Sequence, residues 1–231
     1  KVFNNIGKAF CVDLMEDGKI AMILTRPPEL GTEKVLIQLI HEAKEIIGER
    51  YQLSVTVGVG RTYSDLHLLK YSYSEAVKAS TYKLIYGKNQ IIFFDKLNTD
   101  TGTFIKYTAT IESKLRMMIK HANYNETEQI IDEIIKLITE TGFTPEQVYC
   151  IYYGIINSII KILDELNVVI DKDNELNVES YLSSDRFELI DDLSIALKEL
   201  CLRICNIIQE QRNNKDEEFV KSVSEFINNN Y

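Results

Sequence analysis

The sequence predicts an α+β domain followed by an all-helical segment. In the first 95 residues, short apolar runs that predict strands alternate with segments of helical periodicity, in the order β-β-α-β-α-β. At residues 98–103 the composition shifts to Asn, Thr, Asp and Gly, and beyond them apolar residues recur only at helical spacing. We therefore expect a sheet-and-helix domain at 1–97, a helical bundle or linker domain at 104–212, and a separate short helix at 216–231.

The chain opens with a predicted β-hairpin. Residues 9–15 and 19–25 form apolar runs on either side of Glu16-Asp17-Gly18. An Asp-Gly turn between two such runs is a strong hairpin signal. The second run is apolar at both odd and even positions, which predicts a strand in the centre of the sheet. Pro27 and Pro28 end it.

A helix and a third strand are expected next. The helix runs from Glu33 to Ile47 with an apolar stripe on one side, and Gly48 is its predicted stop. Residues 53–57 alternate apolar and polar side chains, which predicts a half-buried strand. Gly58 and Gly60 then allow a sharp turn.

The remaining elements of the first domain are a helix and a strand. Ser64 precedes an apolar series of helical period, so it is the predicted N-cap. Gly87 and Asn89 stand where a left-handed C-cap is expected. Residues 90–94 form a short apolar strand.

This order of residues resembles a known domain. The Gly58-Val59-Gly60 turn after a strand, the spacing from Ala76 through Tyr82 to Gly87-Lys88-Asn89, and the apolar strand that follows resemble the second half of a GGDEF, or diguanylate cyclase-type, domain. The Ser72-Tyr73-Ser74-Glu75-Ala76 segment resembles the degenerate GGDEF-like domain of bacterial AraC-type response regulators of the YesN kind. The resemblance implies a nucleotide-cyclase-like fold.

The predicted hairpin argues against a working cyclase. In active members of the family, this hairpin carries the carboxylates that help to hold Mg²⁺. Here the turn reads Glu16-Asp17-Gly18-Lys19-Ile20, and the motif is absent. Two divalent cations need several fixed oxygen ligands, which an exposed Glu-Asp pair does not supply. No Arg-x-x-Asp inhibitory motif precedes the hairpin, and the family's first strand, with another metal-binding Asp, is expected to lie outside this chain.

The second half of the chain is predicted to be helical. Residues 111–121 and 126–139 carry apolar stripes, and the second of these helices ends near Gly142. Thr144-Pro145-Glu146-Gln147 is a capping box with proline at the first helical position. The helix that it begins continues to about Leu166 and is apolar almost all round, which is typical of a helix inside a bundle or under a partner subunit. A polar link is expected at 167–184.

The last long helix is predicted from about Asp185 to Gln211. It carries six apolar residues at 3-4-3-4-3 spacing, the pattern of a coiled-coil seam. Two interpretations stay open: an ordinary bundle helix, or a dimer contact that transmits a signal. The six residues are Ile190, Leu193, Leu197, Leu200, Ile204 and Ile207.

A polar break is expected at 211–215, and a short amphipathic helix follows it. Residues 217–231 place Val220, Val223, Phe226 and Ile227 on one face. The I-x-x-x-Y ending resembles the first helix of an AraC-type helix-turn-helix domain, which implies DNA as a partner of the longer protein.

The composition limits the cellular compartment and the binding partners that we expect for this stretch of chain. The formal net charge is −9 without a basic cluster, which argues against direct binding of nucleic acid by this stretch. Cys11, Cys150, Cys201 and Cys205 show no disulfide framework, and their apolar flanks suit reduced, buried thiols in a reducing compartment. The chain lacks an initiator Met, a signal peptide and a membrane-spanning run, so we expect a cytoplasmic piece of a longer protein.

We predict no catalytic, cofactor-binding or metal-binding residues. Four features are candidate sites. For each of them a structural role is favoured over zinc binding, ring stacking on a ligand or phosphate binding. They are the three histidines His41, His67 and His121; the Cys201 and Cys205 pair; the tyrosines Tyr71, Tyr73, Tyr82 and Tyr86; and the Gly58-Val59-Gly60 turn.

These observations favour one function and leave a second open. The first is the regulatory, non-catalytic middle region of an AraC-type transcription regulator, which relays an upstream signal to a DNA-binding domain through dimer geometry. The alternative is a small-molecule or nucleotide sensor that uses the cyclase fold as a ligand pocket. The effector is not identified by the sequence.

Overall fold

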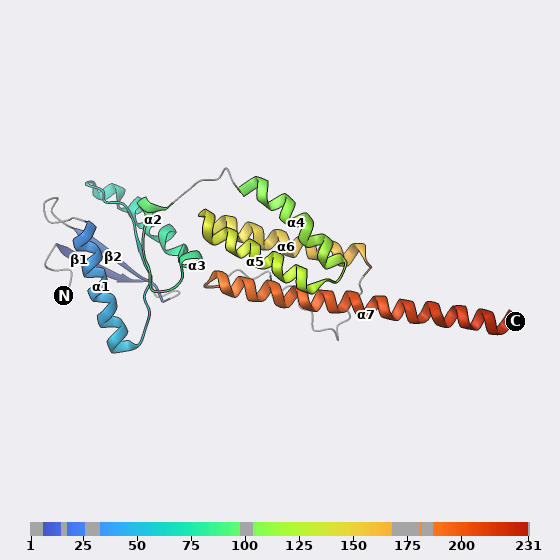
Figure 1. Ribbon diagram of the computed structural model, residues 1–231. Helices are drawn as coiled ribbons and strands as arrows, with labels where there is room; N and C mark the ends of the chain where they lie inside the picture. Colours follow the sequence, from blue (N-terminus) through green and yellow to red (C-terminus); the bar gives the residue numbers. More distant parts are fainter. Residues whose placement is uncertain are drawn as a thin grey trace. The chain divides into compact units, whose positions relative to one another are not determined.

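The computed structural model divides into two compact units, residues 1–97 and 98–231 (Figure 1). The first contains strands and helices, and the described part of the second contains helices only, so the expected fold class is confirmed. The structure describes residues 7–14, 18–25, 33–97, 104–167, 181 and 187–230.

The predicted hairpin is present in the first unit. Strand β1 (Lys8–Asp13) pairs antiparallel with β2 (Ile20–Thr25), from Lys8 opposite Thr25 to Asp13 opposite Ile20. The Leu14 amide donates to the Lys19 carbonyl at 3.1 Å, which closes the loop. Gly18 has φ +61°, a left-handed conformation that suits glycine. Residues 15–17 of the turn lie outside the described part of the chain.

The central position expected for β2 is wrong for the strands that the structure describes. There, β2 pairs with β1 alone, while β3 (Val57–Val59) pairs in parallel with β4 (Ile91–Phe93). In place of the predicted single sheet, the described strands form two sheets of two strands each. Ile20 is 73% exposed, which shows that an apolar strand does not by itself guarantee burial on both faces.

Helix α1 (Glu33–Tyr51) continues past its predicted stop at Gly48. A glycine in a helix costs about 1 kcal/mol, a penalty that neighbouring turns can outweigh. The left-handed residue that follows the helix is Gln52, with φ +55°. The helix therefore ends at Tyr51, four residues after the predicted last residue, Ile47.

The long helix after β3 packs on the β3–β4 pair. A short 3₁₀ turn at Leu66–Leu68 precedes α2 (Leu69–Thr81), and α3 (Lys83–Tyr86) follows it. The side chain that caps the 3₁₀ turn belongs to Asp65 rather than to the predicted Ser64, and it accepts from the His67 amide at 2.8 Å.

The core of this layer is small. It consists of Ala79, Tyr82 and Ile92, against which Ile85, Phe94 and Leu97 pack. Gly87 caps α3 with a positive φ of +87°, but its ψ of −178° lies outside the predicted left-handed helical conformation. Asn89 has φ +63°.

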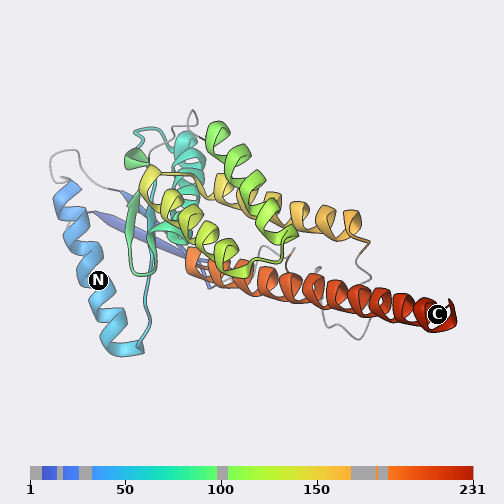
Figure 2. The ribbon, with the colours of Figure 1, turned by 45° about the vertical axis from the view of Figure 1, so that its right-hand side comes forward.

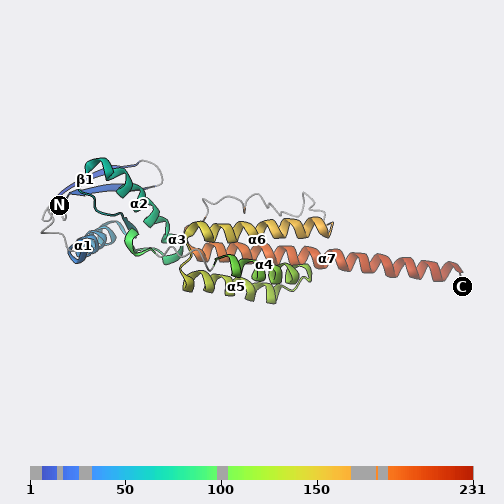
Figure 3. The same ribbon diagram turned by 90° about the horizontal axis from the view of Figure 1, so that it is seen from above.

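Four helices make up the described part of the second unit (Figure 3). They are α4 (Phe104–Lys120), α5 (Tyr124–Thr141), α6 (Pro145–Glu165) and α7 (Ile190–Asn230). Helix α4 packs against α5 and α6, and α5 packs against α7. None of the helices in the described residues is long and apolar enough to cross a membrane.

The bundle is held by a large apolar core with ion pairs at its edges. Fully buried side chains include Ile131 of α5, Ile159 of α6 and Leu200 of α7. At the surface, Lys198 of α7 pairs with Asp132 at 2.6 Å, and Glu165 of α6 pairs with two basic residues of α4, Arg116 and Lys120. Since exposed ion pairs contribute little, the apolar core supplies most of the stability.

Helix α7 differs from its prediction at both ends. It begins at Ile190 rather than Asp185, and it continues without interruption through 211–215 to Asn230. The expected break there is wrong: the segment is polar but contains neither glycine nor proline. Figure 2 shows α7 extending beyond the other helices of its unit. Its residues are buried as far as Ile208 and exposed from Arg212 onwards.

The capping box that starts α6 is confirmed and gives a test of the bundle. The Gln147 amide donates to Thr144 Oγ1 at 3.3 Å, and the Thr144 amide donates to Gln147 Oε1 at 2.8 Å. We expect Thr144→Ala to lower the free energy of unfolding of the second unit by about 1 kcal/mol, measured by urea denaturation. Thr139→Ala is the control, because Thr139 is an exposed residue inside α5, and its loss should change stability by less than about 0.5 kcal/mol. Equal effects of the two substitutions would contradict the role of the cap.

Candidate functional site

Gly58 lies inside β3 and Gly60 directly after it, so the sharp turn predicted at these glycines is wrong for Gly58. The segment 58–60, which keeps the name glycine turn below, is pressed against the backbone of α2. A Cβ added to Gly58 would overlap the Ala76 carbonyl oxygen and would lie 2.7 Å from the Ser80 nitrogen. A Cβ added to Gly60 would overlap the Ser72 carbonyl oxygen. The two glycines therefore serve close packing of a helix on a strand end, which favours the structural interpretation of this motif over phosphate binding.

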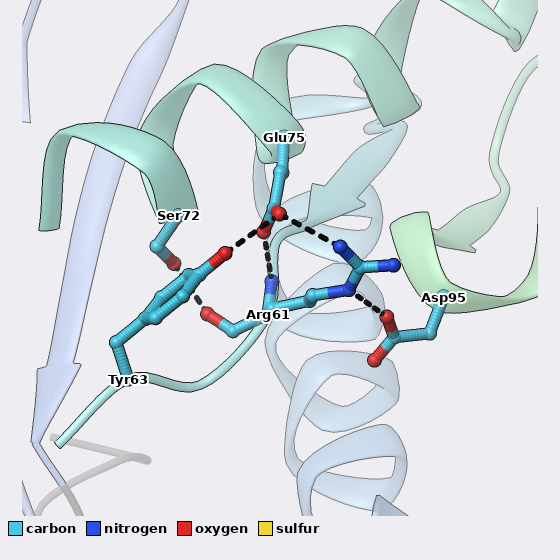
Figure 4. A network of polar contacts seen from close by, with 5 residues as sticks. All are labelled: Arg61, Tyr63, Ser72, Glu75 and Asp95. Carbon is cyan, nitrogen blue, oxygen red and sulfur yellow. Dashed lines mark hydrogen bonds and ion pairs between the residues drawn. The ribbon is translucent and has the colours of Figure 1, made fainter. Parts of the chain in front are cut away.

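Polar contacts from α2 then fix the residue after the turn, Arg61 (Figure 4). The Arg61 amide donates to Glu75 Oε2 at 2.9 Å, and its Nη1 donates to Glu75 Oε1 at 3.3 Å. Ser72 Oγ donates to the Arg61 carbonyl at 2.7 Å. One carboxylate thus binds both the backbone and the side chain of the same residue.

Tyr63 and Asp95 complete the network. The Tyr63 hydroxyl donates to Glu75 Oε1 at 2.8 Å, and this hydrogen bond, together with desolvation, raises the pKa of Tyr63. Asp95 pairs with Arg61 Nε, and the hydrogen bond to Asp95 raises the pKa of the guanidinium. The Arg61 guanidinium carbon also lies 4.9 Å from the centre of the Phe94 ring, a cation–π contact.

The network explains the segment that resembles GGDEF-like domains. Ser72 and Glu75 hold the turn, and Ala76 lies where Gly58 must approach α2. Since Glu75 already occupies the Arg61 amide, that donor is not free to bind an anion. The cluster therefore has a structural role: it fixes the glycine turn, α2 and Asp95 relative to one another.

The three histidines do not come together. His41, His67 and His121 are all exposed, on α1, on the 3₁₀ turn and after α4. Within the described residues, no group of three or more His, Cys, Asp or Glu side chains could hold a metal ion. Glu16 and Asp17 of the hairpin turn lie outside those residues.

Cys201 and Cys205 are buried together on α7. Burial raises the pKa of Cys201 to about 12 and that of Cys205 to about 11. Thiols that stay protonated at neutral pH are poor nucleophiles and poor metal ligands. Both cysteines are free in the structure, and their environment supports a packing role. The expected burial is wrong for Cys11 and Cys150, which are exposed.

The four tyrosines do not form a common surface. Tyr82 is buried in the core of the first unit, whereas Tyr71, Tyr73 and Tyr86 are largely exposed. The Tyr82 and Tyr86 rings lie 5.7 Å apart. This arrangement agrees with packing in the core and at its rim.

The six apolar residues proposed as a dimer seam lie on α7 inside the helical unit. Ile207 is partly buried and the other five are buried: Ile190, Leu193, Leu197, Leu200 and Ile204. Contacts of α7 with α5 and α4 account for this burial. The structure therefore favours a bundle helix over a seam open to a second chain.

Sequence reasoning missed Arg61 and Asp95 as partners. They are 34 positions apart, so no local periodicity links them. Their positions are informative only once the strand pairing is known. Arg61 follows the glycine turn at the end of β3, and Asp95 follows β4, the strand that pairs in parallel with β3.

Comparison with known proteins finds similarity to a described family and to a curated protein. Residues 3–82 match the family described as GGDEF-like domain. A curated relative, the uncharacterised HTH-type transcriptional regulator YtdP of Bacillus subtilis strain 168, is 22% identical over 163 residues. The match covers 69% of this chain but 21% of the relative, so the chain spans about a fifth of that protein's length. No solved structure matches the chain.

The close packing of the glycine turn can be tested by substitution. Gly58→Ala and Gly60→Ala should each destabilise the first unit by about 1–3 kcal/mol, because the new methyl group meets backbone atoms that cannot move aside alone. Gly154→Ala in α6 is the matched control: nothing lies within 4 Å of its Cβ position, so we expect a gain of about 0.5–1 kcal/mol. Thermal unfolding of each variant measures the difference, and wild-type stability of Gly58→Ala would contradict the packing.

Proposed function

We propose that the chain is the regulatory, non-catalytic region of a bacterial transcription regulator of the AraC type. The observation that carries the proposal is the match to a transcription regulator over 163 residues, a length greater than either unit. Because the match must include parts of both units, it supports a shared arrangement of a GGDEF-like domain followed by helices. The match to the GGDEF-like family within the first unit adds to it.

The distal part of α7 supports a DNA-binding domain beyond the bundle. Five large apolar side chains there are 40–68% exposed on one side of the helix. An apolar face of this size is normally covered in a folded protein. In the proposed regulator, the remaining helices of an AraC-type helix-turn-helix domain cover it. The five residues are Phe219, Val220, Val223, Phe226 and Ile227.

The continuity of α7 suggests how a signal reaches that domain. The proximal part of α7 is packed in the bundle, and Arg212 marks the end of this contact. Its Nη2 donates to the Lys120 carbonyl at 2.5 Å, at the C-terminus of α4, where a cation is favoured by the helix dipole. Since one rigid helix leads from the core to the apolar face, rotation of the bundle would turn the DNA-binding domain.

Two DNA readers on one operator require two chains, so the proposal includes a homodimer in the cytoplasm. We do not assign the dimer contact to the buried side chains of α7. Opening the bundle to expose them would forfeit much of its apolar core.

The proposal excludes cyclase activity. Support comes from the hairpin sequence, which lacks the cation-binding motif, and from the glycine turn, which packs on α2. Such a protein would use the cyclase fold to relay a signal and would bind DNA only through its helix-turn-helix domain.

The role of the distal α7 face can be tested in the longer regulator. Val223→Asp should reduce DNA binding at least about tenfold in a fluorescence anisotropy titration, because it places a charge on a face that the DNA-binding domain must bury. Asn228→Asp adds the same charge to the opposite side of the helix and should leave binding within about twofold. Equal loss of binding in both variants would argue for a general charge effect, and unchanged binding in both would contradict the assignment.

The absence of catalysis has a direct assay. Incubation of the chain with GTP and Mg²⁺ should yield no cyclic dinucleotide by chromatography, and thermal unfolding should be unchanged by either ligand. Stabilisation that rises with GTP concentration, as RT ln(1 + [L]/Kd), would favour the ligand-pocket alternative. Formation of product would refute the non-catalytic role.

A further inference from the structure

We propose that Arg61 and the last four residues of the first unit form a releasable latch. We call the segment Phe94–Leu97 the exit segment, because the chain passes from it to residue 98, where the second unit begins. The latch would set the direction in which the chain leaves the GGDEF-like domain. Its consequence for signalling rests on the relay function proposed above.

Arg61 is a suitable fixed side of this latch. Its amide, its carbonyl and its Nη1 are all bound by Ser72 and Glu75 of α2. The side chain can therefore move little without disturbing the helix. The Nε edge and the flat face of the guanidinium meet the exit segment.

The exit segment supplies the movable side. Asp95 pairs with Arg61 Nε, and the Phe94 ring packs beneath the guanidinium carbon at 4.9 Å. The next residue, Lys96, pairs with Glu33 in the first turn of α1. Successive side chains of one short 3₁₀ turn are thus tied to the glycine turn and to α1.

The apolar end of the segment adds a third attachment. Leu97 packs against the cluster of Ala79, Tyr82 and Ile92, and its amide donates to the Phe94 carbonyl at 3.2 Å. This hydrogen bond closes the 3₁₀ turn, so the orientation of Leu97 depends on Phe94 and Asp95 staying in place.

The latch is weak enough to open. The side chains of Arg61 and Asp95 are 51% and 64% exposed, and exposed ion pairs contribute only a small part of the stability of a domain. Its geometry nevertheless requires arginine, because the planar guanidinium binds two carboxylates and a ring at once, which a lysine ammonium cannot do. A change at α2 or at the first turn of α1 could therefore release the exit segment without unfolding the core.

Hydrogen exchange of the full chain tests the latch. In Asp95→Asn, amide exchange in a peptide that covers the exit segment should rise about two- to fivefold, while exchange of β3 and β4 stays at the wild-type rate. Arg61→Lys should show the same rise in the exit segment. Glu49→Gln, which removes an exposed carboxylate from α1, is the control and should leave the exit segment unchanged.

Two outcomes would overturn the latch: unchanged exchange of the exit segment in Asp95→Asn, or an equal rise throughout the first unit. The relay is tested separately by transcription from a reporter promoter with the same variant in the longer regulator. If the exit segment loosens and transcription does not change, the latch stands and the relay fails. If transcription changes while exchange does not, the latch fails and the relay survives.

Discussion

The close approach of α2 to the end of β3 is the constraint on which the first unit depends. It requires the absence of side chains at Gly58 and Gly60, since any Cβ there would meet helix backbone. Once the helix lies this close, Ser72 and Glu75 can bind the backbone of Arg61 directly. The polar network is therefore a consequence of backbone proximity, and the tight packing leaves no room on that side of the turn for a phosphate.

Local signals in the sequence predicted the presence of most elements, but neither their exact bounds nor their partners. The Asp-Gly hairpin and the capping box at Thr144 each depend on a few adjacent residues, and both are confirmed. The place of β2 depends instead on strands remote in sequence, which an apolar pattern does not specify. For the same reason the pairing of Arg61 with Asp95, across 34 positions, could not be read from periodicity.

Helix α7 shows that polarity and helix breaking are separate properties. The segment from Gln211 to Lys215 lacks apolar residues, which mimics a linker in a periodicity analysis. It also lacks proline and glycine, the residues that end helices by removing a donor or by adding backbone entropy. A helix already nucleated in the bundle can propagate through such a segment at little cost per residue, because nucleation is the expensive step. Continuity, rather than a hinge, is what the residues there allow.

The two units differ in what holds them, and the difference bears on where a signal can act. In the helical unit, buried aliphatic residues from several helices interlock, so a displacement of one helix must be shared by the others. In the described part of the first unit, the buried cluster is small, and exposed polar contacts fix the elements around it. Such contacts can break one at a time at low cost. Under the relay function proposed above, the first unit would be the adjustable element and the helical unit the stiff one.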